Sequence, residues 1–110
     1  MADFTIKRHD TRPSLSATLK RDGVAIDLTA ATSVKLILKQ QTTPFTAVTG
    51  TCTIVTPASG IIRYDWIAAD TAVAGTYDCE FEINWGGGNK ETVPNDKEKV
   101  VDIRADIDNA

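Results

Sequence analysis

Apolar and polar residues alternate along most of the chain, in short runs separated by turn-forming residues. In the clearest run, residues 76–85, every second side chain is apolar or aromatic and the positions between them are polar. Successive side chains of a β-strand point to opposite faces, so this period of two predicts a strand with one buried face. Its inward side chains are Tyr77, Cys79, Phe81, Ile83 and Trp85.

The same alternation predicts further strands, each with its own inward side chains. Residues 46–56 form a threonine-rich and more exposed member of the set, and residues 91–93 begin a strand that Pro94 ends. The other inward sets are Phe4 and Ile6; Leu15, Ala17 and Leu19; Val24, Ile26 and Leu28; Val34, Leu36 and Leu38; Val48, Cys52 and Ile54; Ile62, Tyr64 and Trp66; and Val101, Ile103 and Ala105.

Turn-forming residues separate these runs. Asp22 and Gly23 readily adopt the positive φ of a tight hairpin turn. Residues 57–60 (Pro-Ala-Ser-Gly) predict a second turn, and residues 86–89 predict a hairpin tip. Only residues 68–74, which precede a glycine, favour a short helical turn.

Composition agrees with an all-β fold. Thr, Ile and Val, whose branched Cβ atoms favour strands, account for 33 of the 110 residues. The number and spacing of the runs predict one domain over residues 1–110, an immunoglobulin-like antiparallel β-sandwich of seven to nine strands with one short helical turn. We expect residues 106–110 to be a loose tail.

The segment from Asp70 to Cys79 has the spacing of a tyrosine corner, in which a Tyr precedes a Cys by two residues at the start of a late strand. The ring of such a Tyr packs in the core, and its hydroxyl binds the preceding backbone. An immunoglobulin disulfide also needs a Cys on the second strand, where none occurs. We therefore interpret Cys52 and Cys79 as small buried hydrophobic residues, with a bridge between them left open.

Charge is distributed unevenly along the chain. The sequence carries 12 basic and 15 acidic side chains, a net charge of −3, which gives no support to nucleic-acid binding because such binding needs a basic face. Residues 1–60 hold 7 basic and 4 acidic side chains, and residues 61–110 hold 5 and 11. If the basic half and the acidic half of the sequence form different surfaces, the basic side of one subunit could meet the acidic side of another, which would favour homo-oligomeric rings or stacks. If strands from the two halves are interleaved, the charges are mixed on one surface.

Candidate chemistry is sparse. His9 and Asp10 are adjacent, so on a strand they point to opposite faces, and no nucleophile accompanies them. The three-glycine loop lacks the spacing of a phosphate-binding loop. Asp102, Asp106 and Asp108 lack the turn glycine and the bidentate Glu of a calcium loop. The sequence therefore predicts no catalytic residue, no cofactor and no metal site, and hence no enzyme.

Targeting signals are not evident in the sequence. Its first residues lack the apolar stretch of a secretory signal, and prolines and glycines interrupt the long uncharged window over residues 40–62. We therefore expect synthesis in a cytoplasm and no membrane partner.

Two loops offer candidate contacts with a partner protein. Pro44 and Phe45 place an apolar ring in the polar loop 40–47. Gly87 and Asn89 lie at the predicted hairpin tip, where the chain is free of core packing. These four residues are the predicted contact sites.

Several features, in their order along the chain, resemble those of a known family. They are residues 10–13, 19–29, 33–39 and 60–66, Asp70-Thr71, residues 75–77 and Val93-Pro94. Together they resemble the N-terminal domain of phage upper baseplate proteins and related immunoglobulin-like phage tail domains. The resemblance covers nearly the whole chain and brings no family active site.

The resemblance implies a virion component assembled in the host bacterial cytoplasm. It would be a non-enzymatic structural or adaptor protein of a phage or prophage tail or baseplate, docking onto other phage structural proteins. A carbohydrate- or host-receptor-binding sandwich, and a head decoration or connector protein, stay open as alternatives. The carbohydrate alternative needs Trp66 or Trp85 exposed in a groove, whereas their alternation with polar residues directs both indoles inward.

Overall fold

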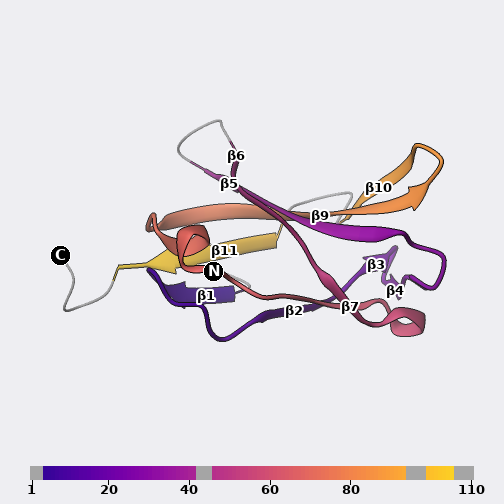
Figure 1. Ribbon diagram of the computed structural model, residues 1–110, viewed down its shortest axis with the longest axis horizontal. Helices are drawn as coiled ribbons and strands as arrows, with labels where there is room; N and C mark the ends of the chain where they lie inside the picture. The colour runs from indigo at the N-terminus through magenta and orange to yellow at the C-terminus, as the bar shows by residue number, and fades with distance from the viewer. Residues whose placement is uncertain (1–3, 42–45, 94–98, 106–110) are drawn as a thin grey trace.

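The computed structural model describes residues 4–41, 46–93 and 99–105, and these fold as a two-layered β-sandwich (Figure 1). The larger sheet has the strand order β1-β11-β9-β5-β6, and β10 also pairs with β9. Its strands are β1 (Phe4–Lys7), β5 (Ser33–Gln40), β6 (Thr46–Thr51), β9 (Gly75–Gly86), β10 (Asn89–Val93) and β11 (Lys99–Arg104).

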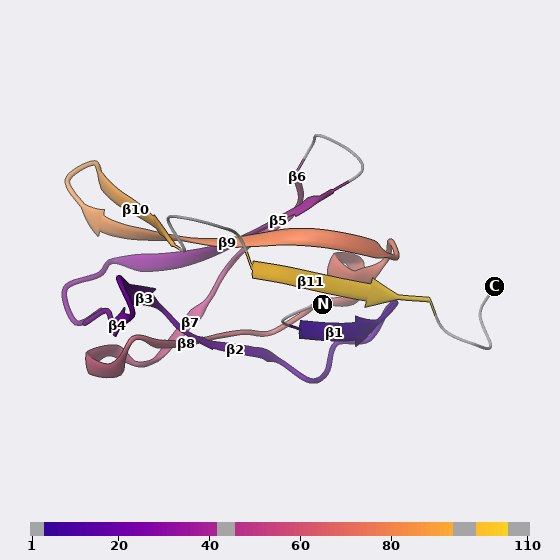
Figure 2. The same cartoon turned by 180° about the vertical axis from the view of Figure 1, so that it is seen from behind.

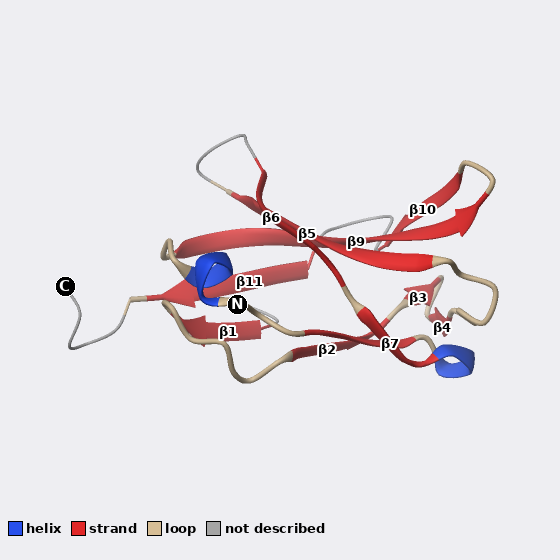
Figure 3. Cartoon of the chain, in the orientation of Figure 1, coloured by secondary structure: helices blue, strands red, loops and turns tan. Residues whose placement is uncertain are grey.

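A smaller sheet with the order β2-β8-β7 forms the second layer, seen from both sides in Figures 1 and 2. The remaining two strands pair as a short separate hairpin. Figure 3 shows that strands dominate and that the only helical pieces among the described residues are two short 3-10 turns. These elements are β2 (Leu15–Thr18), β7 (Thr53–Thr56), β8 (Ile61–Tyr64), β3 (Lys20–Arg21), β4 (Val24–Ala25), η1 (Pro57–Ser59) and η2 (Ala68–Thr71).

The predicted all-β sandwich is confirmed, with three differences in detail. Eleven strands are described instead of seven to nine, because two expected strands are each divided. The pairing is antiparallel except between β1 and β11, which run parallel. Residues 57–60, expected as a simple turn, contain a second 3-10 turn, and the helical piece at η2 ends at Thr71.

Burial in the core confirms most of the inward positions that the alternating pattern predicted. Strand β9 buries Tyr77, Cys79, Phe81 and Ile83, and β5 buries three residues that are 0% exposed. The buried set also contains Ile6, Leu15, Leu19, Ile26, Leu28, Val34, Leu36, Leu38, Val48, Cys52, Ile62, Tyr64, Trp66, Val93, Val101 and Ile103. Burial of these side chains from both sheets is the main force that holds the layers together.

Six residues expected to point inward do not do so fully. Phe4, Ala17 and Ile54 are partly buried and pack against the core. Val24 is 68% exposed, because it directly follows the tight turn at Asp22 and Gly23 on a strand of only two residues. Ala105 is exposed, because β11 ends before it. Trp85 is half-buried near the hairpin tip, where only part of the ring reaches the core.

The expected strand over residues 46–56 is divided between the two sheets. β6 pairs with β5 in the larger sheet, and β7 pairs with β8 in the smaller one. Cys52 lies at the crossing, where its N–H donates to the carbonyl of Val34 at 2.8 Å. This long-range bond anchors the chain as it passes from one layer to the other, and it explains why one alternating run contains two strands.

The tyrosine corner is present as predicted. The hydroxyl of Tyr77, a residue 1% exposed, donates to the carbonyl of Val73 at 2.7 Å. The Asp70 carboxylate binds a different tyrosine: it accepts from the Tyr64 hydroxyl at 2.7 Å and also from the N–H of Ile67 at 3.0 Å. Both tyrosines therefore fix the segment around η2 to the sandwich.

Candidate docking surfaces

The hairpin between β9 and β10 projects from one end of the sandwich (Figure 1). Gly86, Gly87 and Gly88 all have positive φ, at 90°, 62° and 84°, which glycine adopts without steric cost. Residues 87–89 are exposed, and a Cβ added at Gly87 or Gly88 would meet nothing within 4 Å. The tip therefore exposes its backbone and the Asn89 side chain to solvent.

A charged cluster supports the base of this hairpin. Glu91 accepts two hydrogen bonds from the Arg21 guanidinium, at 2.7 and 2.6 Å, and one from the indole of Trp85 at 3.2 Å. Arg21 comes from the β3–β4 hairpin, so the cluster joins two hairpins that are otherwise in different sheets. Side-chain hydrogen bonds to a second hairpin therefore fix the base of the hairpin that carries the tip.

Ionisation of the cluster follows from its contacts. The hydrogen bond from Arg21 is the main cause that lowers the pKa of Glu91, with smaller opposition from burial and further lowering from Trp85. The same hydrogen bond raises the pKa of Arg21. Both groups are charged at neutral pH, and they form an ion pair with 2.6 Å between the Arg21 nitrogen and the Glu91 oxygen.

The four predicted contact residues have different outcomes. Gly87 and Asn89 are exposed at the hairpin tip. Pro44 and Phe45 lie outside the described residues, as does most of the loop that contains them. Contact with a partner at these four positions therefore stays a prediction.

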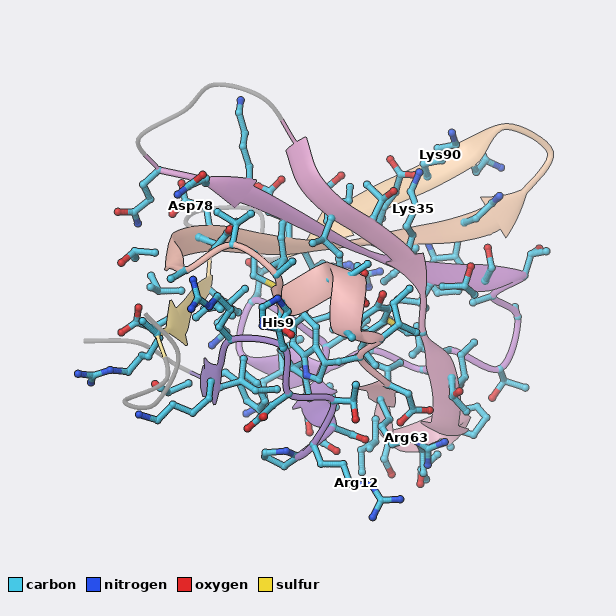
Figure 4. All side chains as sticks on the ribbon, turned by 60° about the vertical axis from the view of Figure 1, so that its left-hand side comes forward. His9, Arg12, Lys35, Arg63, Asp78 and Lys90 are labelled. Atoms are coloured by element: carbon cyan, nitrogen blue, oxygen red, sulfur yellow. The ribbon has the colours of Figure 1, made fainter. Side chains whose placement is uncertain are left out.

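The end of β8 carries an arginine-lined cleft that the sequence analysis did not predict. Arg12 and Arg63 lie close together and point outward (Figure 4), and both line the cleft with Ser14 and Asp65. The Asp65 carboxylate accepts from the Ser14 hydroxyl at 2.7 Å and from Arg63 at 3.0 Å, and these bonds lower its pKa. Residues 12 and 63 are far apart in sequence, so no local pattern could have joined them.

A second cleft, of about 270 Å³, opens beside β2 between the two sheets. Its lining is mainly apolar, with one lysine among the lining residues. The residues that line it include Phe4, Leu15, Ala17, Phe81, Lys99 and Val101. Apart from Lys99, these residues lie on strands that the alternating pattern predicted, but the pattern gave no indication of a space between them.

The two oppositely charged halves of the sequence meet on one face. β5 pairs with β9, and this register sets Lys35 opposite Glu82 and Lys39 opposite Asp78. The Lys35 ammonium lies 3.6 Å from the Glu82 carboxylate. Along these strands basic and acidic side chains face one another and are not separated onto different surfaces. This is the mixed arrangement expected of interleaved strands.

The two tryptophan side chains that the carbohydrate alternative requires on the surface are largely withdrawn from it. Trp66 is 3% exposed, with its ring stacked on Phe4 at 5.8 Å between centroids and edge-on to Tyr64 at 5.1 Å. Trp85 is half-buried and donates to Glu91. The inward prediction holds for Trp66 and in part for Trp85.

Residues with metal-binding or acid–base potential are dispersed in the described part of the chain. No group of three or more His, Cys, Asp or Glu side chains there could hold a metal ion. His9 and Asp10 are exposed on the loop after β1, where the His9 N–H donates to the carbonyl of Thr71 at 3.0 Å. Asp106 and Asp108 lie outside the described residues. Within the described ranges, no helix has the length and apolar character needed to span a membrane.

Comparison with known proteins adds one positive finding. A family model described as the BppU N-terminal domain matches residues 3–106. A search of curated proteins finds no significant match.

Proposed function

The chain belongs to the baseplate upper protein (BppU) N-terminal domain family, and on this premise we propose that it acts as a non-enzymatic adaptor that docks onto neighbouring baseplate proteins. Membership makes it a phage baseplate structural protein and so a component of the virion. The adaptor mechanism, the immunoglobulin-like classification and assembly in the host cytoplasm are parts of the proposal.

The observation that carries the adaptor proposal is the braced hairpin at the end of the sandwich. A contact element must be exposed yet held in place, because ordering a loose loop on binding costs free energy. The tip residues 87–89 are exposed, while Arg21, Glu91 and Trp85 fix the base of the hairpin. This arrangement favours docking in which a preformed hairpin fits the surface of a partner protein.

The test is reconstitution with the other baseplate proteins of the same virion. Asn89→Lys should weaken docking at least about tenfold, which equals the loss of about 1.4 kcal/mol of binding free energy. Thr53→Lys is the matched control, because Thr53 is exposed on β7 away from the hairpin. Phe45→Ser tests the second predicted contact. Unimpaired docking by both Asn89→Lys and Phe45→Ser would contradict the proposed contact sites, and no docking by the unaltered chain would contradict the adaptor role.

A further inference from the structure

Strand β2 lies at an edge of the smaller sheet, because among the described residues it pairs with β8 alone. The N–H of Leu19, which directly follows β2, donates to the carbonyl of Gly60 at 2.8 Å. In an antiparallel pair, backbone groups point alternately toward the partner strand and away from it. Counting back from Leu19, the N–H and C=O groups of Ser16 and Thr18 point away from β8, toward the open side.

This edge lacks the features that protect other edges of the sandwich. The pairings of β6, β7 and β10 with their neighbours all contain a register shift, and β1 carries Lys7. The pairing of β2 with β8 contains no shift, and β2 has neither a charged residue nor a proline. Bulges, charges and prolines are the usual means by which proteins prevent strand addition at an edge. β2 is therefore the edge best suited to accept another strand.

The cleft beside this edge offers space for the side chains of an added strand. Its apolar walls come from both layers, with Leu15 and Ala17 on β2 and Phe81 and Val101 on the larger sheet. Alternate residues of an added strand would point between the sheets, toward these walls, while its backbone paired with β2. Lys99 also lines the cleft and is exposed, so an acidic residue of the added strand would find a cation there.

Strand order explains why this position is open. In immunoglobulin sandwiches one sheet has the order A-B-E-D, so strand A covers the outer edge of strand B. Here β2, β8 and β7 occupy the positions of B, E and D, but the first strand, β1, pairs with β11 in the other sheet. The position next to β2 is therefore left without a strand among the described residues.

We propose that the β2 edge binds an extended segment of a neighbouring baseplate protein as an added strand, with apolar residues at alternate positions and an acidic residue near Lys99. This inference rests on the proposed adaptor function and names the chemistry of its partner. A second copy pairing through its own β2 fits less well. Its Leu15 is buried in its own core, so it would leave the cleft unfilled.

The first experiment uses a synthetic peptide of alternating valine and threonine with one central glutamate. By hydrogen exchange, the Ser16 and Thr18 amides should be less protected than the Ala17 amide in the free protein, and the peptide should slow their exchange at least about tenfold. A peptide with the same side chains but N-methylated backbone should bind at least about tenfold more weakly, because it loses several hydrogen bonds. Unchanged exchange at Ser16 and Thr18, or equal binding of both peptides, would overturn the proposal.

The second experiment blocks the edge in the whole protein. Ser16→Pro removes an N–H that faces the open side, so it should leave the β2–β8 pairing intact, as proline is tolerated on edge strands. Ser16→Pro and Thr18→Lys should abolish peptide binding, whereas Thr53→Lys, on the opposite edge of the same sheet, should retain it. Thermal unfolding of each variant identifies any variant that fails to fold. If Ser16→Pro does not fold, Thr18→Lys still tests the proposal.

The same variants separate this inference from the adaptor function. If Ser16→Pro and Thr18→Lys dock onto the baseplate as the unaltered chain does, the adaptor function stands and strand addition at β2 is wrong. If the unaltered chain binds the peptide but docks onto no baseplate protein, the adaptor function is wrong, and so is the assignment of the added strand to a baseplate protein. The capacity of the β2 edge to bind a strand still stands. Loss of docking in both variants, with docking kept by Thr53→Lys, supports both.

Discussion

The ring of Tyr64 lies directly against the backbone of Gly50, so that β8 of the smaller sheet meets β6 of the larger one. A Cβ at Gly50 would fall 2.6 Å from Cε1 and 2.8 Å from Cζ of Tyr64. Tyr64 is 6% exposed, and its hydroxyl is held by Asp70 at 2.7 Å. The ring therefore has little freedom to move away.

Gly50→Ala should destabilise the fold by about 1–3 kcal/mol, the usual cost of adding a methyl group to a packed contact. Denaturation by urea, followed by tryptophan fluorescence, measures the change. Thr49→Ala is the control: Thr49 is exposed on the same strand, so its substitution should change the free energy of unfolding by no more than about 0.5 kcal/mol. Equal midpoints for Gly50→Ala and the unaltered chain would show that the Tyr64 ring can yield.

Tyr77→Phe should destabilise the domain by about 1–2 kcal/mol, because it deletes the 2.7 Å hydrogen bond to the Val73 carbonyl while keeping the buried ring. The same unfolding measurement applies. Val73→Ala keeps the accepting carbonyl and shortens a side chain that is 58% exposed, so it should be close to neutral. A Tyr77→Phe protein as stable as the Val73→Ala protein would mean that the corner bond adds no stability.

Local sequence patterns predicted the parts of the fold that depend on neighbouring residues. The inward face of β9 follows from strict alternation, and the turn at Asp22 and Gly23 follows from residues that accept positive φ, here 54° and 81°. The corner at Tyr77 was found because its Tyr and Cys are two residues apart. In each case the determining interactions lie within a few positions of one another.

The parts that were missed depend on contacts between distant residues. The run around Cys52 alternates on both sides of the crossing, and the change of sheet depends on pairing with distant strands, β6 with β5 and β7 with β8. Arg21 and Glu91 are separated by 70 positions, so neither hairpin alone predicts their pairing. The cleft beside β2 depends on which strand pairs with β1, and a period-two pattern carries no information on strand order.

Acid should uncouple Arg21 from Glu91. The folded-state pKa of Glu91 is lowered from its ordinary value of 4.5, so its contribution to stability is present above pH 4.5 and is lost as the pH falls through the lower folded-state value. A double-mutant cycle with Arg21→Gln and Glu91→Gln measures the coupling by urea denaturation. We expect favourable coupling at pH 7 that disappears at low pH and weakens in high salt.

The control for this cycle pairs Arg21→Gln with Thr92→Ala, an exposed neighbour of Glu91 on β10. That pair should show no coupling at either pH. Coupling between Arg21 and Glu91 that persists unchanged in acid would mean that the two side chains interact through packing and not through charge.

Cys52 should be almost unreactive in the folded protein. Burial raises the pKa of its thiol to about 12, against a smaller opposing effect of a backbone hydrogen bond at Leu36, and the thiolate is the reactive form. At pH 8, about one thiol in ten thousand would be ionised. In a Cys79→Ala background, a thiol-reactive disulfide reagent should therefore modify the native protein at least about 100-fold more slowly than the urea-unfolded protein. Reaction at the unfolded rate would mean that the crossing between the sheets opens readily, and that the bond from Cys52 to Val34 does not hold it closed.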